Sequence, residues 1–119
     1  MSTKLIMLVG LGGAIGSIVR FLLSLCFLNA VPWVILSINI SGGFLIGILA
    51  RLLESMECGE TLKAFWIVGF CGGFTTFSTF GYDFFNFIRS DQFTHAILYV
   101  GLSVAGTILA VFIGYRVFS

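Results

Sequence analysis

Short polar side chains and aromatic rings are concentrated in one stretch of an otherwise apolar sequence, residues 69–83, which reads GFCGGFTTFSTFGYD. Glycine costs roughly 1 kcal/mol relative to alanine in a helix interior, and short hydroxyl side chains bond nearby backbone groups. We therefore expect a helix that is broken near residues 72–76, with backbone groups left free to bind an ion. The hydroxyl residues that follow the glycine pair are Thr75, Thr76, Ser78 and Thr79.

Phenylalanine recurs through the same stretch at a spacing that places the rings on one face of a helix. The four residues are Phe70, Phe74, Phe77 and Phe80. An aromatic ring has a positive edge, so the rings of Phe77 and Phe80 can solvate an anion without holding it tightly. Conduction requires that an ion leaves as easily as it enters. The pattern favours an ion path over a tight binding site.

Polar side chains in the other apolar segments extend this set, because a polar group inside a bilayer is a functional candidate by default. Asn39 either holds helices together or donates its amide hydrogens to an anion. Tyr99, Ser103 and Thr107 recur every fourth residue, so their hydroxyls stack along one helix face. Arg20 either extends to the lipid headgroups or draws anions into a vestibule.

The remaining residue types argue against an enzyme. The three cysteines are far apart and form no Cys/His pattern, so neither a disulfide framework nor a metal site of that kind is expected. The sequence shows no nucleophile–base pair and no carboxylate pair. We expect Asp83 to lie at the membrane interface. No basic block is present to bind nucleic acid.

The elements that position these groups are predicted to be membrane-spanning helices. The chain of 119 residues is 59% hydrophobic and 9% charged, against about 25% charged in typical globular proteins. Since a bilayer core roughly 30 Å thick needs about 20 helical residues, residues 1–119 are predicted to form a single all-α transmembrane domain. The expected spans are residues 5–28, 31–50, 64–88 and 93–115, with the third helix broken and residues 51–63 forming a solvated connection.

These motifs resemble those of the Fluc family of bacterial fluoride channels, also called CrcB, and the resemblance covers essentially the whole chain. GFCGGFTTFSTF at residues 69–80 is its most specific motif, supported by GGAIGSIVR at 12–20, the Asn39-x-x-Gly42 element, and Tyr99, Ser103 and Thr107. The resemblance implies a passive, fluoride-selective channel that relieves cytoplasmic fluoride toxicity. It also implies an antiparallel, dual-topology homodimer with two pores in the bacterial inner membrane.

The resemblance implies a role for each polar group. Gly72 and Thr75 would supply backbone carbonyl oxygens, two from each subunit, to a sodium ion at the dimer centre. Ile35 stands where many family members have a threonine, so one pore hydroxyl is absent. The fluoride pore would be lined by Asn39, Phe77 and Phe80, with Tyr99, Ser103 and Thr107 as its polar track and Arg20 as the vestibule arginine.

The basic residues favour one orientation, with both termini inside, whereas the resemblance implies insertion both ways. Two other functions fit four apolar helices. A small proton-coupled multidrug exporter needs a membrane-embedded carboxylate, and the first span carries Arg20 instead. A non-transporting assembly subunit would use small-xxx-small pairs, such as Gly12 and Gly16, only for packing.

Overall fold

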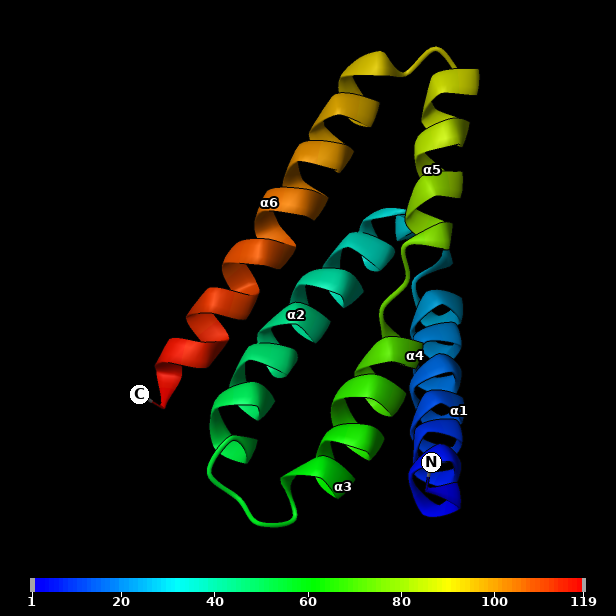
Figure 1. Cartoon of the computed structure of the whole chain (residues 1–119). Helices are drawn as coiled ribbons and strands as arrows, with labels where there is room; N and C mark the ends of the chain where they lie inside the picture. The colour runs from blue at the N-terminus through cyan, green and yellow to red at the C-terminus, as the bar shows by residue number, and fades with distance from the viewer. Residues whose placement is uncertain (1, 119) are drawn as a thin grey trace.

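Helices account for nearly all of residues 2–118, the part of the chain that the computed structural model describes, and no strand occurs among them. The molecule is elongated, with extents of 51 × 30 × 26 Å. The α-helices are α1 Thr3–Cys26, α2 Trp33–Leu53, α3 Gly59–Lys63, α4 Gly72–Phe74, α5 Ser78–Arg89 and α6 Phe93–Val117, joined by a 3₁₀ turn η1 Leu28–Ala30 and a π-helical segment η2 Ala64–Cys71 (Figure 1).

Four helical stretches are long and apolar enough to cross a membrane, which confirms the predicted all-helical, four-span architecture. They are Thr3–Cys26, Trp33–Leu53, Gly59–Arg89 and Phe93–Val117. The third stretch combines α3, η2, α4 and α5, and its mean hydropathy of 1.2 is the lowest of the four. Both termini lie at the end of the bundle that holds the α2–α3 connection (Figure 1).

The expected solvated connection at residues 51–63 is shorter than predicted, because α2 extends to Leu53 and a new helix begins at Gly59. Glu60 lies in the first turn of α3, where it complements the helix dipole, and the helix continues from Lys63 directly into η2. Part of the segment that the sequence assigned to a loop is therefore the first turn of the third helical stretch.

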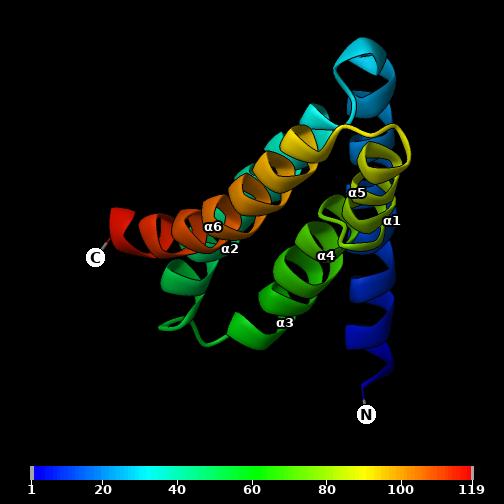
Figure 2. The same ribbon diagram turned by 90° about the horizontal axis from the view of Figure 1, so that it is seen from above.

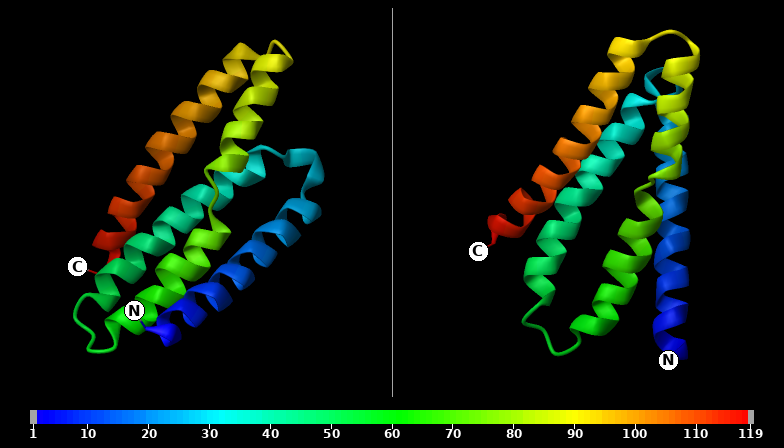
Figure 3. Two further views of the ribbon diagram at one scale, coloured as in Figure 1. Left: turned by 45° about the vertical axis from the view of Figure 1, so that its right-hand side comes forward. Right: turned by 45° about the horizontal axis from the view of Figure 1, so that its top comes forward.

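The long helices pack as two pairs. α2 lies along α6, while α1 lies along η2 and α4, and the view from above separates the two pairs clearly (Figure 2). α5 leaves the second pair at the break and packs against α6, to which a short turn connects it (Figure 3). The break therefore lies where the chain passes from one helix pair to the other.

Glycines allow the paired backbones to approach closely. A Cβ atom on Gly47 of α2 or Gly114 of α6 would collide with a backbone carbonyl of the facing helix. The same holds for Gly12 and Gly16 of α1, which face η2. Since lipid supplies no hydrophobic force between helices, close van der Waals packing of this kind holds a membrane bundle together.

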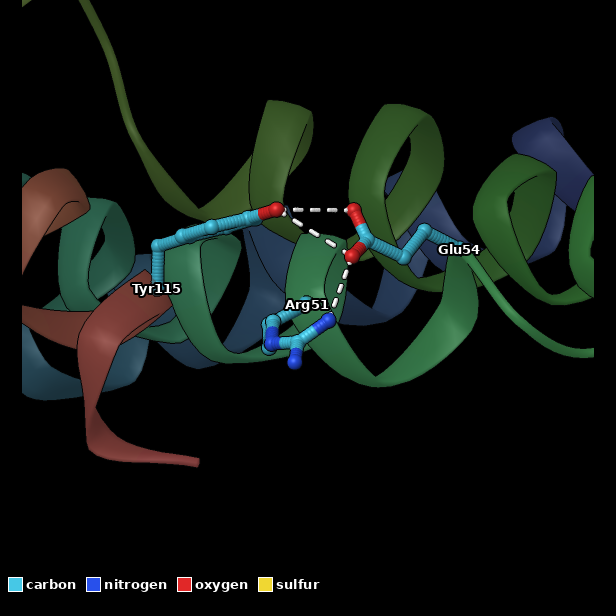
Figure 4. Close-up of polar contacts among 3 residues, drawn as sticks. All are labelled: Arg51, Glu54 and Tyr115. Atoms are coloured by element: carbon cyan, nitrogen blue, oxygen red, sulfur yellow. Dashed lines mark hydrogen bonds and ion pairs between the residues drawn. The ribbon is translucent and has the colours of Figure 1, made fainter. Parts of the chain in front are cut away.

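A polar contact also joins α2 to α6 near their ends (Figure 4). The Tyr115 hydroxyl donates to the Glu54 carboxylate, at 2.9 Å from Oε2 and 3.1 Å from Oε1. Arg51 forms an ion pair with the same carboxylate and lies over the Tyr115 ring. The Tyr115 and Arg51 hydrogen bonds hold the pKa of the Glu54 carboxyl below its usual range.

Candidate functional site

The predicted break is present in the third span. α4 ends at Phe74, the backbone of Thr75 is extended (φ −84°, ψ 156°), and α5 begins at Ser78. Figure 3 shows this non-helical link between α4 and α5. The break thus falls at the C-terminal edge of the predicted region, residues 72–76, because the helix continues through both glycines and ends where the hydroxyl residues begin.

Asn39 holds the broken segment from α2. Its side-chain oxygen accepts the Thr76 N–H at 2.9 Å, and its Nδ2 donates to the Thr76 carbonyl at 3.0 Å. Asn39 is 9% exposed, so this paired contact is largely shielded. The structure therefore shows the helix-holding role of Asn39, and it leaves one of the two amide hydrogens for another acceptor.

The side chain of Thr76 caps the start of α5. Its Oγ1 accepts the Thr79 N–H at 3.2 Å and lies 3.3 Å from the Ser78 hydroxyl. Within residues 2–118, the backbone N–H groups of Phe77, Ser78 and Phe80 make no hydrogen bond. A helix N-terminus with free N–H groups carries a partial positive charge. This end of α5 can attract an anion.

A groove of about 290 Å³ runs between α2, the break and α6. It brings together five of the six predicted pore residues, which the sequence places far apart. Its polar lining comes from Asn39, Thr75, Thr76, Ser103 and Thr107, and its apolar lining from Gly43, Ile46, Phe77, Phe80, Val104, Ile108 and Val111.

Ser103 is the most informative residue of the groove. It is 6% exposed, and its hydroxyl oxygen is buried without any hydrogen-bond partner among the described residues. A buried hydroxyl without a partner is unfavourable, so its presence calls for a ligand or a water molecule. Thr107 lies one turn further along α6 and also lines the groove. Ile35, which the resemblance matches to a threonine, is 3% exposed and is not part of the lining.

Tyr99, the sixth predicted pore residue, lies behind the groove wall. Its ring is fully buried and stacks on Phe80, with ring centroids 5.3 Å apart. Its hydroxyl donates to Asp83 Oδ2 at 3.0 Å. The expectation that Asp83 is not buried is wrong, because this residue is 8% exposed and its carboxylate accepts the Tyr99 hydroxyl. The α5–α6 packing supplies a partner that offsets the burial of Asp83.

The spacing of the four phenylalanines predicted that their rings share one helix face, and this prediction is wrong. Phe70 and Phe74 stack at 5.7 Å, and Phe77 and Phe80 form a second pair at 5.5 Å. The extended backbone at Thr75 separates the pairs, so helical periodicity does not continue across the break. Only the second pair lines the groove, and Phe77 is 83% exposed.

Arg20 contacts Thr75, one of the two expected sodium ligands, at the break. Arg20 Nη1 donates to the Thr75 carbonyl oxygen at 3.3 Å. Arg20 therefore reaches across from α1 to the broken backbone and does not extend away from the protein. Gly72 is exposed, and a Cβ atom added there would meet only the Ile67 carbonyl oxygen, at 3.9 Å.

Sequence reasoning missed Thr76 as the residue that Asn39 holds, and Asp83 as a buried partner of Tyr99. The hydroxyl pattern marked Thr76 as polar. Its partner is 37 residues away in the sequence, and no local pattern identifies such a pairing.

Comparison with known proteins places these features in a family. The family model described as "CrcB-like protein, Camphor Resistance (CrcB)" matches residues 7–115. A fluoride-specific ion channel FluC of Azobacteroides pseudotrichonymphae is 38% identical over 117 residues, which is 94% of each chain.

Proteins of the same name from other bacteria are also similar to this chain. The one from Rhizobium meliloti is 40% identical over 114 residues, covering 92% of this chain and 91% of the relative. The one from Leptospira interrogans serovar copenhageni is 40% identical over 117 residues, covering 94% and 92%. These matches span all four helical stretches, and the chain belongs to the CrcB-like family.

Proposed function

We propose that this chain forms a fluoride-selective channel that passively exports fluoride from the cytoplasm and so relieves fluoride toxicity. The observation that carries the proposal is the groove between α2, the break and α6, which gathers amide and hydroxyl groups and two aromatic rings in a membrane-spanning protein. The relatives' name, fluoride-specific ion channel, supports the same function and argues against an enzyme.

The groups in the groove suit a small anion. The amide of Asn39, the unpartnered hydroxyl of Ser103 and the hydroxyl of Thr107 are hydrogen-bond donors. The free N–H groups at the start of α5 add a positive helix end beside Phe77. Fluoride is small and strongly hydrated, so only a dense series of donors replaces its water, and a narrow path rejects chloride.

An antiparallel, dual-topology homodimer with two pores completes the proposal. The groove of one chain is open along one side, where Phe77 is 83% exposed. Polar groups cannot face lipid without a partner. A second copy that covers the open side would enclose the groove, and two such contacts would give two pores in the inner membrane.

Asp83 is the one observation that favours a proton-coupled exporter, since such a protein needs a buried carboxylate. However, Asp83 accepts the Tyr99 hydroxyl and does not line the groove, where a transported molecule would bind. A proton gradient therefore should not alter transport. Drug uptake that requires a pH gradient across the vesicle membrane would favour the exporter.

Ion release from vesicles tests the proposed function. Purified protein is reconstituted into vesicles loaded with potassium fluoride or potassium chloride, and valinomycin is added to carry the counter-charge. We expect rapid fluoride release, measured with an ion-selective electrode, and chloride release equal to that of protein-free vesicles. Sealed fluoride vesicles, or equal release of the two halides, would contradict the proposal.

A further inference from the structure

Two carbonyl oxygens at the break lack the partners that a continuous helix would give them. In an α-helix, each N–H donates to the carbonyl four residues earlier. The Thr76 N–H would therefore bind the Gly72 carbonyl, and the Thr79 N–H would bind the Thr75 carbonyl. Instead, the Thr76 N–H donates to Asn39 Oδ1 at 2.9 Å, and the Thr79 N–H donates to Thr76 Oγ1 at 3.2 Å.

Within residues 2–118, no other backbone N–H donates to the Gly72 carbonyl or to the Thr75 carbonyl. An unpaired carbonyl at membrane depth is unfavourable unless protein or water satisfies it. The Thr75 oxygen receives one long hydrogen bond from Arg20, at 3.3 Å, and a carbonyl oxygen has a second lone pair. Gly72 is exposed on the protein surface. Each oxygen thus has at least one lone pair that no hydrogen bond among the described residues fills.

The donor set fits sodium, since unwound backbone carbonyls coordinate sodium in membrane proteins. A bound sodium ion would supply a positive charge that satisfies the free oxygens. Two oxygens from one chain would not complete its coordination. Gly72 and Thr75 of a second copy would have to complete the site, which in this respect rests on the proposed homodimer.

We propose that Asn39 and Thr76 are positioning residues for this sodium site. Each side chain binds an N–H that would otherwise return to a coordinating carbonyl: Asn39 frees the Gly72 oxygen, and Thr76 frees the Thr75 oxygen. Neither side chain touches the cation. Because Asn39 also lines the groove, one amide connects the anion path to the cation site.

Sodium-dependent stabilisation of the purified dimer tests the role of Asn39. A ligand that binds only the folded protein raises the unfolding temperature, and we expect sodium chloride to raise the wild-type midpoint by about 5 °C over choline chloride at equal ionic strength. Asn39→Ala should lose this shift, because the Thr76 N–H becomes free to return to Gly72. Asn39→Asp keeps an oxygen acceptor at the same position and should keep the shift, whatever its effect on fluoride release.

Thr76 provides an independent test that does not alter the groove amide. Thr76→Val removes the hydroxyl with little change of shape, so the half-maximal shift should need about tenfold more sodium. Thr76→Ser keeps the hydroxyl and should restore the wild-type response. Thr79→Val is the matched control, because the Thr79 hydroxyl makes no hydrogen bond within residues 2–118 and only its backbone N–H joins the cap.

The results separate this inference from the proposed function. Wild-type protein that shows the sodium shift but releases no fluoride would contradict the channel and leave the positioning role standing. Wild-type protein that conducts fluoride but shows no sodium shift would overturn the inference alone. An equal shift in wild type, Asn39→Ala and Thr76→Val would also overturn it, as would loss of the shift in Thr79→Val.

Discussion

At Asn39 a single amide contributes to two parts of the molecule. Its oxygen and one of its hydrogens hold the Thr76 backbone, and the side chain lines the groove. An amide has two hydrogens to donate, so holding the break and donating to an anion are compatible roles. The two interpretations that the sequence left open for Asn39 are therefore not exclusive.

Ser103 allows a test that separates conduction from packing. Its hydroxyl is buried without a partner, so Ser103→Ala removes an unsatisfied group and should leave the unfolding temperature unchanged or slightly higher. If the hydroxyl serves a passing anion, the same substitution should lower fluoride release from vesicles several-fold. Both quantities are measured on one preparation, by thermal unfolding and by the fluoride electrode.

Ser37→Ala is the matched control. Ser37 is exposed on α2, and its hydroxyl donates to the Trp33 carbonyl of its own helix. Fluoride release should remain at the wild-type rate in this variant. Unchanged release in Ser103→Ala, or an equal loss in the two variants, would argue against Ser103 as part of the path.

Residue types were sufficient to predict which polar groups gather, but not how each one is satisfied. Asn39, Ser103 and Thr107 stood out because they are polar within apolar segments, and the groove unites them. Tyr99 stood out for the same reason, yet its hydroxyl is already donated to Asp83. Such pairing depends on the packing of α5 against α6, which composition and spacing do not determine.

At the scale of elements, the break could be predicted because its cause is local. Glycines and hydroxyl residues weaken a helix wherever they occur together, and α4 ends beside them. The anchoring of the break by α2 and the separation of the phenylalanine pairs could not be predicted. Both follow from contacts between segments that are distant in the sequence.

Close packing of α2 and α6 predicts a strong effect of a single methyl group. Gly47→Ala places a Cβ against the backbone of α6, and overpacking of this kind costs typically about 1–3 kcal/mol. We expect a lower unfolding temperature and a smaller monodisperse fraction on size-exclusion chromatography. Loss of fluoride release should follow, because α2 and α6 form two walls of the groove.

Gly101→Ala is the matched control on α6, since nothing lies within 4 Å of a Cβ added there. Alanine favours a helix over glycine by up to about 1 kcal/mol, so this variant should be as stable as wild type or more stable. Equal stability of Gly47→Ala and wild type would show that the two helices are not packed at Gly47 in the membrane.

At the scale of the whole molecule, the groove between α2, the break and α6 is only partly enclosed by a single chain. The exposed ring of Phe77 and the polar lining both lie on this open groove. A single chain therefore holds the donors but does not enclose them. The proposed homodimer would supply the missing wall.

If fluoride crosses through this groove, replacing an aromatic side chain of its lining should stop fluoride release from vesicles. Phe80 lines the groove, whereas Phe112 on α6 is 66% exposed and is not part of the lining. We expect Phe80→Ile protein to elute like wild type yet to release fluoride no faster than protein-free vesicles, while Phe112→Ile releases it at the wild-type rate. Fluoride release at the wild-type rate by Phe80→Ile would show that fluoride does not cross through this groove.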